Sequence, residues 1–151
     1  MDLYEILLFV HITSVVVWVG GSIALEVVGG RFAAANDAVA SAAYGQHTAD
    51  LGTKLFMPAS IAVLVSGIWM VADAGIPWEE PFVVYGIVAI VVTTVIGAAF
   101  LGPQTAKLEA LVQEKGPAAP EVGVATKRFL TITRINTLVL LSAIFVMTVK
   151  P

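Results

Sequence analysis

The stretch PFVVYGIVAIVVTTVIGAAFL, residues 81–101, runs for 21 residues without a charged side chain. A helix rises about 1.5 Å per residue, so about 20 apolar residues cross the hydrocarbon core of a bilayer. Backbone polar groups must be satisfied within such a segment, which makes it a helix. On either side of it, three more stretches meet the same requirement: residues 3–28, 55–72 and 129–149. The sequence predicts an all-α membrane protein, an antiparallel bundle of four transmembrane helices.

The overall composition agrees with this prediction. Of the 151 residues, 58% are hydrophobic and 13% are charged, whereas soluble domains have about 25% charged residues. The net charge of −3 gives no electrostatic basis for binding nucleic acid. The absence of cysteine excludes disulfides, thiolate metal sites, iron–sulfur clusters and a cysteine nucleophile. A small integral membrane protein is the class that fits.

Basic residues are unevenly distributed among the segments outside the spans. Six of them follow spans one and three, the connection between spans two and three has none, and the C-terminus has one. Cytoplasmic loops carry the excess of lysine and arginine, so we expect both long loops in the cytoplasm and both termini outside. The predicted location is the plasma (inner) membrane of a bacterium or archaeon. The six residues are Arg31, Lys54, Lys107, Lys115, Lys127 and Arg128.

The two long loops also have helical character. Asn36 or Asp37 can cap a helix through residues 37–54, and residues 104–115 have helical spacing of their apolar side chains. The sequence contains no internal repeat. We therefore predict one integral membrane domain over residues 1–151, with two cytoplasmic helical extensions.

His11 lies about one third of the way into the first span, on one helix face with Ser14, Trp18 and Gly21. A histidine within hydrocarbon is costly and normally faces a bundle interior or a cavity. Two interpretations stay open. The ring is satisfied by a serine or a backbone carbonyl across the bundle, or it ligates a metal such as haem iron. His47 lies in a cytoplasmic segment too distant to join His11, and we expect it on the solvated surface.

The neighbours of His11 allow the same two interpretations. Trp18 is midway along the span and is either core filler or one wall of a cofactor pocket. Gly21, with Gly20 and Ala24, provides small residues where a neighbouring helix or a flat cofactor can approach closely. A methionine or tyrosine second ligand, or an open site, is compatible with the residues that the other spans place near the depth of His11: Ser66, Met70, Tyr85, Ser142 and Met147.

Glu26 and Arg134 lie at similar depth near the cytoplasmic ends of spans one and four. Unpaired charges at that depth are expensive, so an ion pair between the two side chains is the economical prediction. A second interpretation places an anion or haem propionate beside Arg134, with Lys54 and Arg128 close by. The two roles can coexist.

Two stretches resemble known membrane proteins: LLFVHITSVVVWVGG, residues 7–21, and RINTLVLLSAIFVMTVKP, residues 134–151. The first is similar to the opening helix of the four-helix family grouped around HemJ-type protoporphyrinogen oxidases and CopD-type copper-resistance proteins. In that helix a histidine precedes aromatic and small residues. The second is similar to the R-x-N start and Lys-Pro end of the family's last helix. KLFMPASIAVLVSGIWM, residues 54–70, is a weaker third match.

The resemblance implies that His11 ligates a b-type haem and that Arg134 and Asn136 close the pocket or bind a carboxylate. Span three lacks the lysine that HemJ-type enzymes carry deep in a later helix. The resemblance is therefore closer to a branch known only as predicted integral membrane proteins, for which it implies a fold and not a reaction.

The function predicted from the sequence is haem b binding within the bundle, at His11, Trp18, Gly21, Arg134 and Asn136, for a membrane redox step. A haem-dependent oxidoreductase reaction is left open. One alternative is a CopD-like transporter of a metal ion or small solute, which would need a polar path through the bundle. The side chains that could line such a path are His11, Ser14, Ser66, Thr93, Thr94, Thr133 and Asn136. The other is a structural subunit that docks on a membrane partner or on a second copy of the chain.

Overall fold

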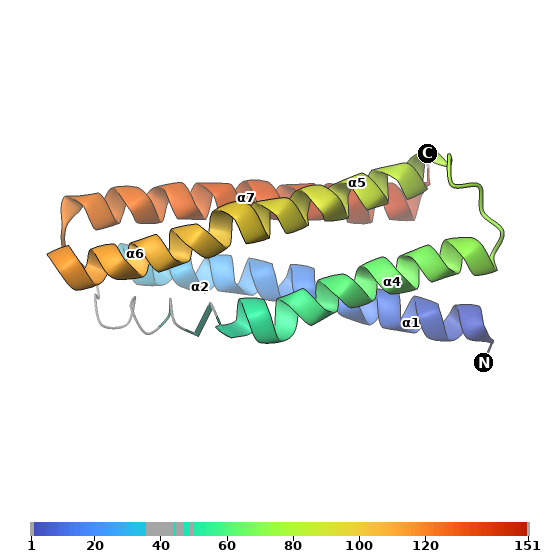
Figure 1. The fold of residues 1–151 in the computed structure, drawn as a ribbon, viewed down its shortest axis with the longest axis horizontal. Coiled ribbons are helices and arrows are strands. Elements are labelled where there is room, and N and C mark those ends of the chain that lie inside the picture. Colours follow the sequence, from blue (N-terminus) through green and yellow to red (C-terminus); the bar gives the residue numbers. More distant parts are fainter. Residues whose placement is uncertain (1, 36–43, 45–46, 49, 151) are drawn as a thin grey trace.

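The apolar stretches form four helical rods that lie side by side, alternate in direction, and leave both termini at one end of the bundle (Figure 1). A computed structural model describes residues 2–35, 44, 47–48 and 50–150. The first rod consists of α1 (Leu3–Val15), the π-helical turn η1 (Val16–Gly20) and α2 (Gly21–Ala35). The other rods are η2 (Gly52–Phe56) with α4 (Met57–Asp73), α5 (Pro81–Val95) with η3 (Ile96–Leu101) and α6 (Gly102–Lys115), and α7 (Pro120–Val149).

Four continuous helices are long and apolar enough to cross a membrane, and no strand occurs in the described part of the chain. They cover Leu3–Phe32, Gly52–Asp73, Pro81–Lys115 and Pro120–Val149. The predicted fold class, an all-α bundle of four transmembrane helices, is confirmed.

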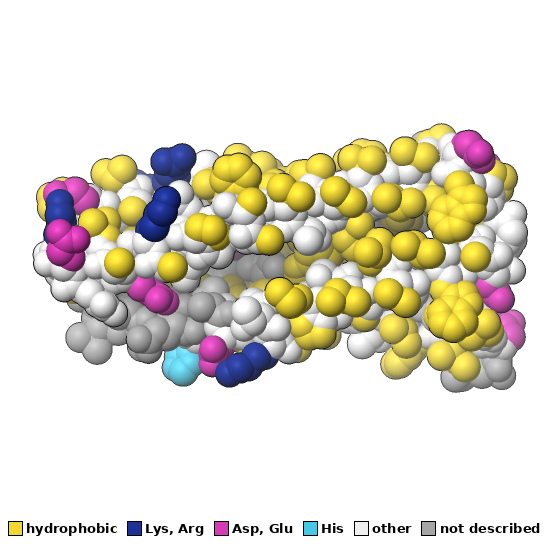
Figure 2. All heavy atoms as spheres, viewed as in Figure 1, with side chains coloured by type: hydrophobic (Ala, Val, Ile, Leu, Met, Phe, Trp, Pro, Cys, Tyr) yellow, Lys and Arg dark blue, Asp and Glu magenta, His cyan; other side chains and the backbone are white. Residues whose placement is uncertain are grey.

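The helices continue beyond the predicted spans. The first and last cover 30 residues each, and at 1.5 Å per residue each is about 45 Å long, against a hydrocarbon core of about 30 Å. On the face shown in Figure 2, Lys and Arg side chains gather toward the end away from the termini. Helix α6 covers the predicted segment 104–115 and continues α5 through η3. The predicted segment 37–54 falls largely outside the described residues.

Local sequence determines where the helices begin and end. Asp2 and Glu5 form a capping box before α1, in which Asp2 Oδ1 accepts the Glu5 N–H at 2.8 Å and Glu5 Oε2 accepts the Asp2 N–H at 3.0 Å. Helices α5 and α7 begin at Pro81 and Pro120, which have no N–H to satisfy in the first turn. Helix α6 ends at Gly116, whose φ of 81° favours glycine. These ends turn α6 directly into α7.

The bundle consists of two closely packed helix pairs. Helix α1 packs along α4, and α5 packs along α7. The two pairs meet where α2 contacts α7 and, less extensively, where α4 contacts α5. Helices α1 and α7, both fully described, do not approach each other closely. The two pairs are therefore in tighter contact in the half away from the termini.

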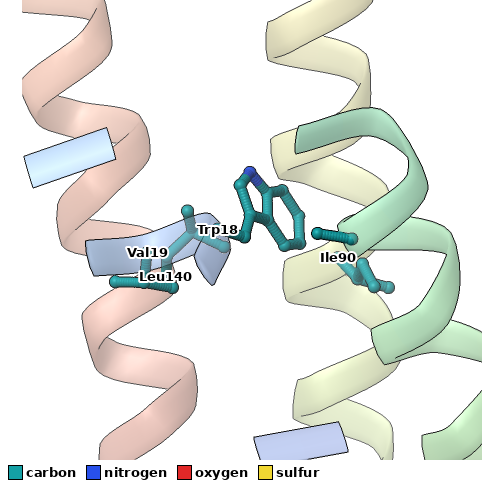
Figure 3. Packing of buried hydrophobic residues seen from close by; sticks show 5 residues of the cluster. Trp18, Val19, Ile90 and Leu140 are labelled. Atoms are coloured by element: carbon teal, nitrogen blue, oxygen red, sulfur yellow. The ribbon is translucent and has the colours of Figure 1, made fainter. Parts of the chain in front are cut away.

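A small apolar core lies midway along the bundle (Figure 3). The Trp18 ring points from η1 toward Ile90 of α5, and Val19 lies against Leu140 of α7. Ala59 of α4 completes the cluster. This layer joins the two helix pairs and separates the two halves of the molecule.

Candidate cofactor site

A cavity of about 520 Å³ lies between the two helix pairs, in the half of the bundle nearest the termini. All four rods contribute to its wall, with His11 on α1, Gly67 on α4, Gly86 on α5 and Met147 on α7. Sites for small molecules and cofactors typically measure about 300–1,000 Å³ and are mostly apolar. The volume and the wall are those of a ligand site, which we call the interhelical cavity.

The core layer forms the floor of the interhelical cavity. Trp18, Val19, Ile90 and Leu140 line it as well as packing together. The sequence left Trp18 open between core filler and pocket wall, and the structure places it in both positions. Any occupant of the cavity rests on this layer.

The interhelical cavity also opens sideways, toward the lipid. Val16 lines it and is 64% exposed. Ile12 on the same helix, Ile68 on α4 and Ile87 on α5 likewise line the cavity and face outward. Figure 2 shows the bundle hollowed between α4 and α5 on the face drawn. The cavity is therefore a slot between the helix pairs and not a sealed chamber.

The orientation of His11 follows from its hydrogen bond with Ser66. The His11 Nδ1 and Ser66 Oγ atoms are 3.1 Å apart. The Ser66 hydroxyl donates its single hydrogen to the backbone carbonyl of Ala62, one turn earlier in α4. Ser66 Oγ therefore accepts from His11, which places the hydrogen of a neutral ring on Nδ1. The backbone of Val63 also hydrogen-bonds the ring. With its hydrogen on Nδ1, the ring would present the Nε2 lone pair to an occupant of the cavity.

Gly67 lets the His11 ring lie directly against α4. A Cβ atom at this position would lie 3.2 Å from His11 Cε1, closer than ordinary van der Waals contact. The ring is thus held by its hydrogen bond to Ser66 and by close contact with the backbone of the next residue, Gly67.

Gly86, on the other helix pair, lets the Met147 side chain lie directly against α5. A Cβ atom at Gly86 would lie 1.9 Å from Met147 Cε, so the end of the Met147 side chain would have to move. The thioether of Met147 therefore lies across the backbone of α5 at the cavity wall.

The rim nearest the termini carries a cation and aromatic side chains. Tyr4, Trp78 and Lys150 line the cavity there. Lys150 ends α7 in a left-handed conformation, with φ 48° and ψ 59°, and its Nζ lies 5.5 Å from the centre of the Phe82 ring. An anionic group at this rim would meet the Lys150 ammonium.

Three of the predicted site residues lie away from the interhelical cavity. A Cβ atom on Gly21 would lie 2.6 Å from Phe56 Cε1, so this glycine accommodates a neighbouring aromatic ring. Arg134 is exposed on α7. Asn136 is buried on α7, and its Oδ1 has no hydrogen-bond partner among the described residues. Of the predicted set, the cavity brings together His11 and Trp18 alone.

The predicted ion pair between Glu26 and Arg134 is wrong. Thr137 Oγ1 donates a hydrogen bond to Glu26 Oε1, and the exposed Arg134 makes no ion pair with this carboxylate. Arg134 is three residues from Thr137 in the sequence, but the helix turns its side chain outward. A hydroxyl donor, with no cation, holds the Glu26 carboxylate.

The site includes residues for which the sequence alone gave no role. Ser66 and Met147 were singled out by depth, and both lie at the cavity or beside His11. Gly67, Gly86 and Lys150 were not expected there. The positions of the two glycines in the sequence could have indicated this role. Gly67 lies six residues before the end of α4, and Gly86 lies five residues after the start of α5, on either side of one short connection.

The described residues contain no cluster of side chains that could hold a metal ion without a cofactor. Among residues 2–35, 44, 47–48 and 50–150, no three His, Asp or Glu side chains come together as ligands. The exposed His47 lies on the segment between α2 and η2 and has no part in the cavity.

Comparison with known proteins gives a family and no finer relationship. The sequence model of a family described as predicted integral membrane protein (DUF2269) matches residues 5–151. No curated protein and no solved structure matches the chain. This match, together with the four long apolar helices, establishes that the chain is an integral, multi-pass membrane protein. The narrower resemblance to HemJ-type and CopD-type proteins stays a prediction.

Proposed function

We propose that this protein, which belongs to the DUF2269 family of predicted integral membrane proteins, binds a b-type haem in the interhelical cavity through His11. The bound haem would serve a membrane redox step. The observation that carries the proposal is the position of His11: its Nδ1 lies 3.1 Å from Ser66 Oγ while the ring lines a ligand-sized apolar cavity. Metal-ligating histidines usually donate their second ring N–H to such a partner, which fixes the tautomer.

The residues of the cavity suit a flat, apolar macrocycle. Trp18 provides a broad floor, and the slot between the helix pairs is continuous with the lipid-facing surface. Lys150 lies at the rim, where it would pair with a propionate. Haem bound here supplies reversible one-electron chemistry at its iron. This chain would supply the nitrogen ligand from His11, the apolar surroundings and the cation of Lys150.

The volume of the cavity argues for a macrocycle over a bare ion. About 520 Å³ is far more than a coordinated ion needs, and copper would want several histidine and methionine donors close together. Only one histidine lines the cavity.

The transport alternative has less support from the side chains that were expected to line a polar path. Thr93 and Thr133 donate to backbone carbonyls of their own helices, as does Ser66. Thr94 is exposed. These hydroxyls are therefore occupied or directed outward instead of facing a common channel.

One observation favours the assembly alternative as a second function. Gly20 and Ala24 are exposed, and so are Ala98 and Gly102. Small residues on a lipid-facing surface let a second helix approach closely. Docking on a partner or on a second copy of the chain is compatible with haem binding.

The decisive experiment is the absorption spectrum of the full-length protein, purified in detergent after expression with supplied haem. We expect a Soret band, and sharp α and β bands after reduction with dithionite. The variant His11→Ala should lose the bands while keeping its helical circular dichroism. His47→Ala is the matched control, because His47 is exposed outside the spans, and it should keep them.

Two results would overturn the proposal. One is a featureless spectrum of the wild-type protein after haem has been supplied. The other is a folded His11→Ala variant that retains haem with an unchanged spectrum. Either would leave His11 as a packing histidine satisfied by Ser66.

A further inference from the structure

We infer that Met147 supplies the second axial ligand, so that the haem is held between a histidine nitrogen and a methionine sulfur. This inference rests on the proposed function, because it concerns the second side of the same haem. The sequence left the second ligand open among methionine, tyrosine and an open site. Among the methionines of the described chain, the geometry of the cavity favours one residue.

The first argument concerns the walls of the slot. Axial ligands reach a haem iron from opposite faces of the macrocycle, so the two donors must come from opposite walls. His11 belongs to the pair α1 and α4, and Met147 belongs to the pair α5 and α7. These pairs are the two walls between which a flat ligand fits.

The second argument concerns depth. Gly67, against which the His11 ring lies, is six residues before the last residue of α4. Gly86, across which Met147 lies, is five residues after the first residue of α5. At 1.5 Å per residue these positions are about 9 Å and about 7.5 Å from the same connecting loop. Both side chains therefore lie in the half of the bundle nearest this connection.

The third argument excludes the other methionines of the described chain. Met70 also lines the cavity, but it lies on α4, on the same wall as His11. Met57 is at the far end of α4 and is exposed. Only Met147 is both at the cavity and on the wall opposite His11.

The chemical consequence is a particular kind of haem. A methionine sulfur opposite a histidine raises the reduction potential relative to sites without it, because the thioether favours ferrous iron. A site with both axial positions filled transfers electrons and leaves no open position for an iron-bound substrate. The structure thus points to electron transfer rather than oxygen activation.

The test compares Met147→Leu with Met70→Leu, at the other methionine of the cavity, and with Met57→Leu as the control outside it, in the full-length, haem-loaded protein. Leucine keeps a similar apolar volume. Met147→Leu should lose the far-red charge-transfer band that marks an iron–sulfur bond in the oxidised protein. Its oxidised iron should shift toward high spin, and its midpoint potential should fall. Met57→Leu, at the exposed far end of α4, should leave all three properties unchanged, and Met70→Leu should keep the charge-transfer band.

Two further measurements cover a variant that fails to fold. The wild-type oxidised spectrum must itself contain the charge-transfer band. Gly86→Ala, which leaves every candidate donor present but displaces Met147, should weaken that band.

The outcomes separate this inference from the proposed function. Haem that depends on His11 but is indifferent to Met147→Leu overturns the second ligand alone. So does a wild-type spectrum without the band, or an effect confined to Met70→Leu. A protein that binds no haem, or binds it without His11, overturns both.

Discussion

The two halves of this bundle are built from the same four rods, yet one is hollow and the other is closed. In the hollow half, between the termini and Trp18, the glycines Gly67 and Gly86 are crossed by the side chains of His11 and Met147. In the closed half, beyond Trp18, a Cβ atom on Gly21 or Gly29 would collide instead with the ring of Phe56 or of Tyr44. Glycine permits close approach in both halves. The side chain that lies against each glycine makes the difference. In the closed half it is an aromatic ring that fills the space between the helices, and in the hollow half it is a side chain in the wall of the cavity.

The polar groups of the two halves differ in a parallel way. In the closed half, the Glu26 carboxylate is held by Thr137, and the Tyr44 hydroxyl donates to the carbonyl of Leu25. Burial raises the pKa of the Tyr44 phenol, so it stays neutral. In the hollow half, Ser66 occupies only one nitrogen of His11. The closed half pairs Glu26 and Tyr44 internally, whereas in the hollow half one nitrogen of His11 would remain for a ligand.

The largest expected effect is at the layer between the halves. Trp18→Ala should lower the free energy of unfolding by about 3–5 kcal/mol, because a buried indole is removed from the core layer between the two pairs. Unfolding in mixed micelles by added denaturing detergent, followed by circular dichroism, measures this. Trp69→Ala is the control, since that ring is 52% exposed toward lipid, and it should cost far less. Equal losses would contradict the assignment of Trp18 as the structural layer.

An intermediate effect is expected in the closed half. Thr137→Val should cost about 1–3 kcal/mol, because it removes the hydroxyl donor and leaves the half-buried Glu26 carboxylate unsatisfied. Haem content should not change. The same substitution at the exposed Thr131, whose hydroxyl bonds to its own helix at Lys127, should have little effect on the unfolding midpoint. A loss of haem in Thr137→Val would show that the two halves are not separable.

The smallest effect is expected at Asn136. Its Oδ1 is buried without a partner among the described residues, so Asn136→Leu should be neutral or stabilising by up to about 1 kcal/mol. Thermal unfolding and the Soret absorbance of the same samples measure stability and haem content together. A drop in haem content would return Asn136 to the binding site, where the resemblance to HemJ-type proteins had put it.

The contrast between the halves also explains how far sequence reasoning could go. Residues 81–101 have no charge, and apolar length alone then predicts four spans, because a bilayer leaves few other folds. Depth along the spans was enough to relate Ser66 and Met147 to His11. Gly21 was different: it shares a helix face with His11, but Phe56, 35 residues later, covers it. Which side chain crosses a glycine is a property of packing between rods and is not encoded in the periodicity of one helix.

Arg134 illustrates the same limit for charges. Two opposite charges at one depth predict an ion pair. The orientation of α7 about its own axis, however, decides which of its side chains faces α2. Thr137 faces Glu26 and Arg134 does not. A search of the sequence for opposite charges does not identify a threonine hydroxyl as the partner of a carboxylate. The ion pair was therefore predicted, and it was wrong.

The sideways opening of the interhelical cavity changes the thermodynamics of filling it. The competitor for a slot bordered by Val16 and Ile68 is an acyl chain or a detergent tail, not water. Apolar contact with the slot then contributes little affinity, because hydrocarbon is exchanged for hydrocarbon. Retention of an occupant must come from bonds that lipid cannot form, to His11, Met147 and Lys150. The choice of detergent during purification therefore decides whether an occupant survives long enough to be seen.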